Sequence, residues 1–283
     1  MQATTAPPAT DIYLAPLRVQ DGRVMVGAPV NVTARPGYDN QPFFLPDGRA
    51  FLYTSIREDS QADIYRYDLR RATSVRLSTT RESEYSPTPL PDGKGFSVVR
   101  VEADSTQRLW AFDEDGARPR LVLDSIKPVG YHAWGDAHTV VLFVLGSPPT
   151  LQIADTRAPA ARGTVIAQNI GRSLQRVPGS AAVAFLQRDS VAGDWIKKVD
   201  PHTKTLTPLV RALDGADFFT WTPGGIALAA RGSKLYQWNP RRTREWEAVA
   251  DFAAAGLTNV TRLAVSPTGD HLAVVAVPQT GPR

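Results

Sequence analysis

The sequence predicts an all-β protein: a six-bladed β-propeller with four antiparallel strands per blade, the last blade shared between the N- and C-termini. Three observations predict this fold. A turn rich in proline and glycine recurs six times along the 283 residues at nearly constant spacing. Short apolar segments follow in the same order around each turn, and the two chain ends hold complementary parts of one repeat. Repeats of roughly 40 to 50 residues with four strands each are typical of propellers.

The recurring turn is clearest in the first two repeats. Phe44–Phe51 has the sequence FLPDGRAF, and Pro89–Phe96 has PLPDGKGF. In such a turn proline restricts φ, aspartate accepts hydrogen bonds from nearby backbone N–H groups, and glycine tolerates positive φ. One glycine from each repeat gives the series Gly48, Gly93, Gly135, Gly179, Gly224 and Gly269, with gaps of 45, 42, 44, 45 and 45 residues.

The segments between the turns have the pattern of four short strands. One apolar strand leads into each turn and a second follows it, as in Ala50–Thr54 and Val140–Val144. A third strand carries an aliphatic-aromatic pair, as in Asp63–Tyr65, and a fourth strand such as Ser74–Leu77 completes the repeat. No segment has a sustained 3.6-residue period, so we expect at most one short helical turn, within Glu245–Ala255.

Both chain ends are predicted to belong to the same blade. Asp11–Leu17 matches the third strand Asp63–Leu69 at four positions, so the propeller begins with third and fourth strands. It ends with Val260–Val265 and Leu272–Val277, which have the pattern of first and second strands. Pairing the two halves closes the ring through main-chain hydrogen bonds and removes exposed sheet edges.

We expect residues 1–10 to form a flexible leader and residues 11–283 to form a single propeller domain. The leader is rich in Ala, Thr and Pro and resembles what remains when a signal peptide has been removed and a start Met added. We therefore expect a periplasmic or secreted protein. The predicted blades span residues 37–79, 81–124, 126–167, 168–210, 213–252, and 257–278 together with 11–33.

Composition excludes several kinds of site and partner. The absence of cysteine excludes disulfides, thiolate metal sites and a cysteine nucleophile. No stretch approaches the roughly 18 apolar residues of a membrane span, so we expect no transmembrane segment. The formal net charge is +4, but the arginines are dispersed and the densest group is Arg241–Arg244. Dispersed arginines are typical of a solvated surface, so we expect no nucleic-acid partner.

The repeats resemble the TolB-like propeller family, with its WD40-like or PD40 repeats. Pro42–Gly48 with Asp63–Tyr65, and Pro87–Gly93 with Leu109–Trp110, carry the resemblance. It covers nearly the whole chain after residue 10, and it is weakest in the third and fourth repeats. The resemblance implies a fold that is shared by periplasmic scaffold proteins and by the gating propellers of peptidases.

No sequence motif supports catalysis. The chain has no G-x-S-x-G, H-E-x-x-H, Walker A or G-x-G-x-x-G sequence. Its four histidines are too dispersed to converge on one metal ion, although His132 lies in a predicted first strand where it can face the channel. We therefore predict no catalytic residue, no metal site and no cofactor.

Propeller geometry places the candidate binding site. The loops that lead into first strands and those that join second and third strands share one face, around the mouth of the central channel. Charged residues recur at both positions. Near the starts of first strands are Asp39, Glu84, Lys127, Arg172, Asp217 and Arg262, and at the ends of second strands are Arg57, Arg100, Arg188 and Arg231.

We expect a non-enzymatic binding or scaffold propeller, monomeric, whose funnel of arginines binds a protein, a peptide or a small acidic ligand. Arginine suits this role because it pairs bidentately with carboxylates. Alternatively, each arginine is a solvated loop residue paired with a nearby carboxylate such as Asp194. The alternative function is a metal-assisted hydrolase or lyase, in which Asp39, Glu84 and Asp217 supply oxygen ligands.

The opposite face is predicted to carry a basic rim. The turns between third and fourth strands are rich in basic residues, which suits contact with an anionic surface such as a membrane or a cell-wall polymer. Solvated turns are the alternative. The residues are Arg70, Arg71, Arg118, Arg120, Arg157, Arg162, Lys204, Arg241, Arg242 and Arg244.

Overall fold

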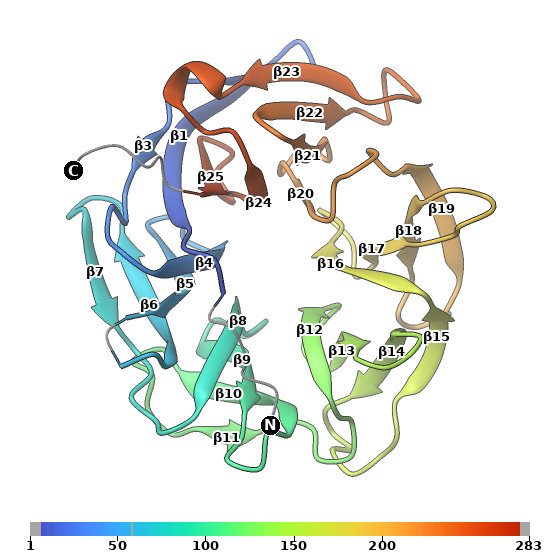
Figure 1. The fold of residues 1–283 in the computed structure, drawn as a ribbon. Coiled ribbons are helices and arrows are strands. Elements are labelled where there is room, and N and C mark those ends of the chain that lie inside the picture. Colours follow the sequence, from blue (N-terminus) through green and yellow to red (C-terminus); the bar gives the residue numbers. More distant parts are fainter. Residues whose placement is uncertain (1–6, 58, 278–283) are drawn as a thin grey trace.

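Six antiparallel sheets stand around a central axis and form a closed ring, as Figure 1 shows in a view along that axis. The computed structural model describes residues 7–57 and 59–277. In each sheet the first strand lies nearest the axis and the fourth lies at the circumference. The predicted six-bladed, all-β propeller is therefore confirmed. No helix in the described part of the chain is long and apolar enough to cross a membrane.

Blades 1 to 3 each use one continuous stretch of chain. Blade 1 comprises β4 (Tyr38–Phe44), β5 (Ala50–Ile56), β6 (Ala62–Asp68) and β7 (Thr73–Arg76). Blade 2 comprises β8 (Ser83–Pro89), β9 (Gly95–Val101), β10 (Gln107–Asp113) and β11 (Arg120–Leu121). Blade 3 comprises β12 (Val129–Trp134), β13 (Thr139–Val144), β14 (Thr150–Asp155) and β15 (Thr164–Gln168).

Blades 4 and 5 repeat the same order of strands. Blade 4 comprises β16 (Ile170–Arg176), β17 (Val183–Gln187), β18 (Trp195–Val199) and β19 (Leu206–Arg211). Blade 5 comprises β20 (Phe219–Trp221), β21 (Ala227–Arg231), β22 (Lys234–Trp238) and β23 (Glu247–Asp251). The short 3-10 helix η1 (Ala253–Ala255) follows β23 and is the one helical element among the described residues, as the sequence led us to expect.

The sixth blade is built from both ends of the chain, as predicted. Its inner strands are β24 (Val260–Val265) and β25 (His271–Ala276). β25 pairs antiparallel with β1 (Asp11–Gln20) over six consecutive residue pairs, from Asp11–Ala276 to Pro16–His271. The outermost strand is in two pieces: β2 (Arg23–Val26) pairs with the second half of β1, and β3 (Val30–Asn31) pairs with the first half.

The apolar core lies between neighbouring blades and not on the axis. The described residues form six clusters of buried apolar side chains, one at each interface between blades. Between blades 1 and 2, for example, Leu52 and Ile64 belong to one cluster with Phe96 and Phe112, whose rings stack 5.3 Å apart. Because apolar surface is buried between the sheets, the axis is left as a channel.

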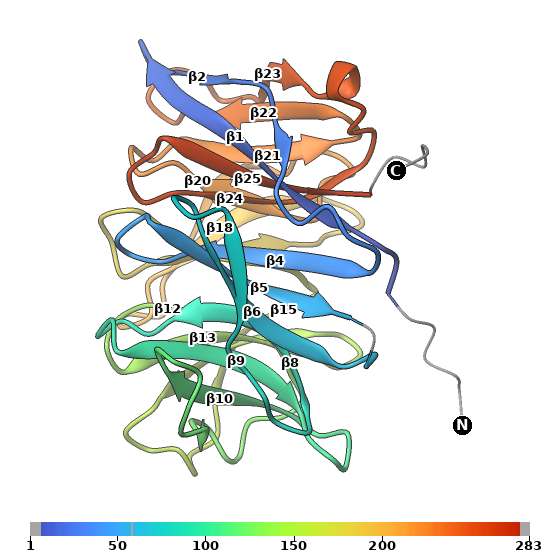
Figure 2. The same ribbon diagram turned by 90° about the vertical axis from the view of Figure 1, so that its left-hand side faces the viewer.

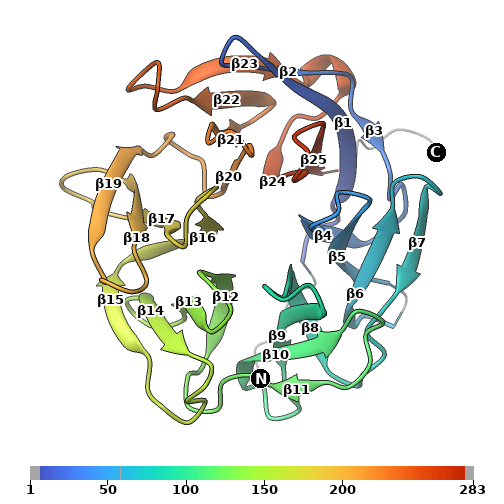
Figure 3. The ribbon, with the colours of Figure 1, turned by 180° about the vertical axis from the view of Figure 1, so that it is seen from behind.

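Loops and turns alternate between two faces of the ring because the strands of each blade are antiparallel. The mouth face carries the loops that lead into first strands and those that join second and third strands. The turn face carries the turns between first and second strands and between third and fourth strands. β1 begins and β25 ends on the mouth face, at the right-hand side of Figure 2, and Figure 3 looks onto the turn face.

The end of the predicted leader contacts blade 1. Residues 1–6 lie outside the described residues. Thr10 is buried and forms a parallel β-bridge with Tyr38. Its N–H donates to the Gly37 carbonyl at 3.1 Å, and its own carbonyl accepts from the Asp39 N–H at 2.9 Å. The chain therefore joins the start of blade 1 before it enters blade 6.

Candidate functional site

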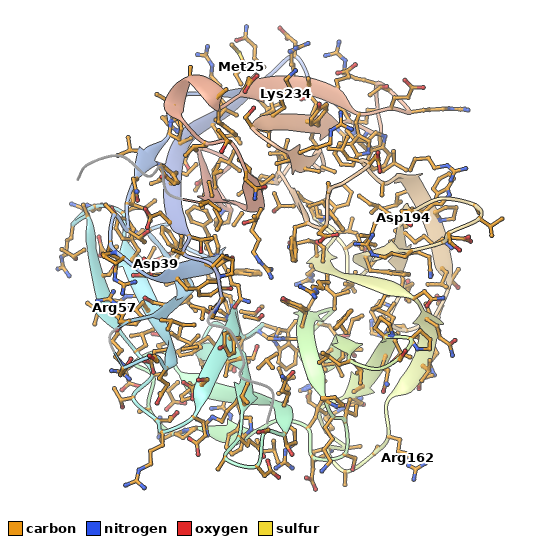
Figure 4. The ribbon with its side chains drawn as sticks, viewed as in Figure 1. Met25, Asp39, Arg57, Arg162, Asp194 and Lys234 are labelled. Atoms are coloured by element: carbon orange, nitrogen blue, oxygen red, sulfur yellow. The ribbon has the colours of Figure 1, made fainter. Side chains whose placement is uncertain are left out.

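Three of the four predicted second-strand arginines pack on aromatic rings of their own blades. A guanidinium over a ring face is attracted by the ring quadrupole. Figure 4 shows Arg57 on the outer side of Asp39, away from the central opening. The three guanidinium carbons lie over ring centroids as follows: Arg57 on Tyr65 at 3.9 Å, Arg100 on Trp110 at 4.2 Å and Arg231 on Tyr236 at 5.5 Å.

The fourth of these arginines, Arg188, connects blades 4 and 5. Its Nη1 donates to Asp194 at 2.8 Å, and its Nη2 donates to Asp217. All three side chains are at least one-third exposed, and such surface ion pairs stabilise a fold little. Arg188 and Asp217 therefore pair with each other, and neither lines the channel.

Asp39 and Glu84 occupy equivalent positions in blades 1 and 2, and both are fully buried. Asp39 accepts hydrogen bonds from Ser55 Oγ at 2.6 Å and from Arg35 Nη1 at 3.1 Å. Glu84 Oε1 accepts from Arg100 Nε at 3.1 Å. Burial raises the pKa of both carboxyl groups, and the neighbouring arginines act in the opposite direction. These pairs tie the start of a first strand to its neighbours.

The predicted oxygen ligands for a metal ion do not converge. Asp39, Glu84 and Asp217 are each paired with a different arginine. Within residues 7–57 and 59–277, no three His, Asp or Glu side chains are grouped closely enough to hold a metal ion. Lys127 is exposed in the loop that leads into β12.

A small cavity on the axis, here called the axial cavity, has a volume of about 70 Å³. It lies where first strands carry β-bulges, for example between Asn40 and Phe43 in β4 and between Val260 and Arg262 in β24. A bulge adds a residue and redirects a side chain. Residues from all six blades line the cavity, among them Gln41, Ser86, Tyr131, Arg172, Phe218 and Arg262.

Arg262 spans the channel. Its Nη2 donates to Tyr131 Oη at 2.8 Å. Its guanidinium carbon lies 3.7 Å from the ring centroid of Phe218 and 5.1 Å from that of Tyr131. Tyr131 belongs to blade 3, which lies opposite blade 6 in the ring (Figure 1). The contact therefore narrows the channel at the level of the axial cavity.

The axial cavity carries positive charge that no acidic residue balances. Arg172 lines it from blade 4 and Arg262 from blade 6, and no Asp or Glu is among the lining residues. Neither arginine forms an ion pair with a described carboxylate. Burial raises the pKa of the nearby Tyr38 hydroxyl, so this ring stays neutral. Arg172 is exposed and Arg262 is half-buried, and two neighbouring positive charges of this kind attract anions.

His132 also lines the axial cavity, as its position in a first strand suggested, and it carries no charge there. Burial lowers its pKa to about 3. Its Nε2 lies 2.7 Å from Ser97 Oγ, which also accepts from Trp134 Nε1 at 2.9 Å. Because Ser97 Oγ donates to the Thr88 carbonyl, we assign the imidazole hydrogen to Nε2.

A larger cavity, here called the turn-face bowl, lies at the other end of the channel and has a volume of about 620 Å³. Phe43, Trp134 and Trp221 are among its walls, together with the turn prolines Pro46, Pro91, Pro178, Pro223 and Pro267. Phe43, Leu174, Gln175 and Leu263 line both cavities, so the two are continuous. Its volume lies within the roughly 300–1,000 Å³ of ligand pockets.

The predicted basic rim surrounds this bowl on the turn face. The turns between third and fourth strands all lie on that face, and their basic residues are exposed. Several of them pair locally: Arg118 and Arg120 with Asp113, and Arg157 with Asp155. Figure 4 shows Arg162 at the outer edge of the ring.

No protein-family model matches the sequence. A putative TolB from Agrobacterium tumefaciens has a similar structure, with a TM-score of 0.73 at 14% identity over 96% of this chain and 100% of that chain. TolB from Acinetobacter baumannii has a TM-score of 0.57 at 15% identity over 94% of this chain and 64% of that chain. An oligogalacturonate lyase from Vibrio parahaemolyticus has a TM-score of 0.58 at 12% identity over 97% of this chain and all of that chain. At these identities the likeness shows the fold, a six-bladed propeller of the TolB-like type.

Proposed function

We propose that this six-bladed propeller is a non-enzymatic binding or scaffold protein whose channel binds the anionic group of a protein, a peptide or a small acid. One observation carries the proposal: Arg172 and Arg262 line a narrow cavity that has no acidic residue in its walls. Guanidinium groups bind carboxylates with two parallel hydrogen bonds. Arg262 is half-buried, so its attraction for an anion is stronger than in bulk water, whereas the exposed Arg172 is more strongly screened.

The proposed ligand-binding residues line the channel, and only some of them are among the residues predicted from the sequence to form the funnel. Arg172 and Arg262 belong to both, and Lys127 is exposed in the loop before β12. Asp39, Glu84 and Arg100 are buried and bonded to neighbours within the protein, so their contribution is to hold the first strands in place.

The alternative of a metal-assisted hydrolase or lyase has less support. An oligogalacturonate lyase shares the fold, but one fold hosts many unrelated functions. The two carboxylates placed best for this chemistry, Asp39 and Glu84, are each bound to an arginine.

A paired substitution tests the binding function. We expect the wild-type protein to bind succinate or citrate at low ionic strength in isothermal titration calorimetry. R172Q/R262Q is expected to weaken that binding at least ten-fold. R157Q/R162Q is the matched control, because it removes the same charge from exposed turn residues that do not line the axial cavity. Equal binding by the three proteins, or no binding by the wild type, would refute the proposal.

We also propose that the protein acts as a monomer in the periplasm or outside the cell. The leader, rich in Ala, Thr and Pro, supports export. Fractionation of cells that express the complete natural reading frame tests the compartment, and a cytosolic location would contradict export. Light scattering during size-exclusion chromatography tests the monomer, because the mass expected from the chain is 30.8 kDa.

A further inference from the structure

We propose that the channel binds the C-terminal end of a partner polypeptide, with the terminal carboxylate at Arg172 and Arg262 and the preceding apolar residues in the turn-face bowl. This inference rests on the proposed function of the axial cavity and names its ligand class. It also gives the ligand a direction of approach, from the turn face, opposite to the funnel that the sequence predicts on the mouth face.

The order of residues along the first strands sets the depth of the two cavities. In β24, Arg262 lines only the axial cavity, Leu263 lines both cavities, and Val265 to Pro267 line only the bowl. Since first strands run towards the turn face, the bowl lies nearer that face, and Arg172 and Arg262 lie beyond its inner end, towards the mouth face, where Arg172 is also exposed to solvent. Across the axis, the bond between Arg262 and Tyr131 narrows the passage towards the mouth face.

The charges and volumes of the two cavities fit a terminal carboxylate that is preceded by apolar residues. The axial cavity has a volume of about 70 Å³, which suits one small polar group, since a water molecule takes up about 30 Å³ in the liquid. Its two cations have no carboxylate partner among the described residues, and they therefore complement an anion. The bowl has a volume of about 620 Å³, and its walls are mainly proline rings and large side chains such as Phe43 and Trp134, with Arg176 as the one charged lining residue. Such walls complement apolar side chains.

The length of the bowl corresponds to a few residues of extended chain. Its wall in blade 6 runs from Leu263 to Pro267, four residues further on. At about 3.3 Å per residue, this wall is at most about 13 Å deep, since β24 ends at Val265 and the chain then turns. An extended peptide has a similar rise, so about four C-terminal residues reach from the rim to the two arginines.

The backbone of the channel wall favours a peptide over another amphiphile. Each first strand is the innermost strand of its sheet, and apart from the start of β4, which also pairs with Thr10, one side of its backbone faces the axis. Unpaired strand edges of this kind bind extended peptides through main-chain hydrogen bonds. An acyl chain has no N–H or C=O groups to offer them. Thr88 and Gln175, which line both cavities, add further polar groups.

Four probes distinguish this inference from the proposed function: an acetylated Ala-Leu-Val-Leu peptide with a free carboxylate, its C-terminal amide, succinate and octanoate. We expect wild-type protein to bind the free peptide at least ten-fold more tightly than the amide, succinate or octanoate in calorimetric titrations. R172Q/R262Q is expected to bind neither the free peptide nor succinate.

Substitution in the bowl completes the test. Pro267 is exposed in a turn and lines the bowl but not the axial cavity, so P267D places a charge in the bowl wall without emptying a core position. We expect P267D to weaken peptide binding at least ten-fold and to leave succinate binding unchanged. V191D is the matched control, because Val191 is 95% exposed in a mouth-face loop. Melting curves establish that each variant is folded.

The results distinguish failure of this inference from failure of the proposed function. If succinate binds but the free peptide binds no more tightly than its amide, or P267D has no effect on peptide binding, the inference is wrong and the anion site stands. If octanoate binds as tightly as the peptide, the assignment to a polypeptide is wrong. If no probe binds, both the inference and the proposed function are wrong.

Discussion

The buried pair of Glu84 and Arg100 offers a stringent test of how the first strands are held. The side chains of Glu84 and Arg100 are 0% and 6% exposed, and the Nε–Oε1 distance is 3.1 Å. The Arg100 guanidinium also lies 4.2 Å from the ring centroid of Trp110. R100A removes both contacts and leaves the Glu84 carboxylate buried without its cation.

Breaking a buried ion pair by removing one partner costs about 3–5 kcal/mol. In a domain of this size each kcal/mol lowers Tm by about 2–4 °C, so we expect R100A to melt about 6–20 °C below the wild type. E84Q/R100M replaces the pair with an uncharged one of similar volume, and it is expected to recover most of the loss.

The pH dependence of the R100A stability loss shows whether the buried Glu84 carboxylate causes it. Burial raises the pKa of Glu84 above its unfolded value, and loss of Arg100 raises this pKa further. A raised carboxyl pKa destabilises the fold fully above the folded pKa, and this effect declines as the pH falls from the folded towards the unfolded pKa. The stability deficit of R100A should therefore shrink between neutral and acidic pH, and that of E84Q/R100A should not.

Urea unfolding followed by intrinsic fluorescence between pH 7 and pH 4 measures both effects. R157A is the control, because it removes an arginine from an exposed pair with Asp155 and should change stability little. A deficit for R100A below about 1 kcal/mol, or one that is constant with pH, would refute the assignment of a buried, uncompensated carboxylate.

Two further predictions concern closure of the ring and backbone packing. Removal of residues 11–33 deletes the outer strands of blade 6 and exposes the edge of β25, so we expect aggregation or a large fall in Tm in light scattering and calorimetry; an unchanged Tm would contradict the shared blade. G95A places a Cβ 2.0 Å from the Phe112 carbonyl oxygen, inside a strand pair, so we expect it to lower the free energy of unfolding by more than G93A does. Gly93, at φ +71°, has open space around it, so G93A should lose only about 1–2 kcal/mol. If urea unfolding gives the same loss of stability for G95A and G93A, the close contact with the Phe112 carbonyl oxygen does not account for the effect of G95A.

The number of blades, their strands and the joined termini could all be predicted from the sequence, because the chemistry that specifies them is local. Gly48, Gly93, Gly179 and Gly269 all have φ between +70° and +75°, as the turn pattern requires. In blade 5 the positive φ belongs to Gly225, next to the predicted Gly224. Spacing alone does not distinguish adjacent glycines, since either keeps the repeat period.

The candidate site could be predicted only in part. Repeat alignment correctly placed Arg172 and Arg262 near the starts of first strands, and it gave Arg57, Arg100 and Arg231 equivalent places at the ends of second strands. Alignment contains no information on distance from the axis, and the three second-strand arginines lie over rings of the third strand. No sequence pattern singled out Tyr131 or Phe218 as partners of Arg262.

By itself, the sequence determined the repeating unit, because turns and strand patterns depend on residues close together in the chain. Only the tertiary structure decided which charges lack a partner. Arg262 meets Tyr131 across the channel although 131 positions separate them, and bulges in the first strands set which side chains line the axial cavity. Whether an arginine is neutralised depends on distances through space between blades, and periodicity along the chain does not encode those distances.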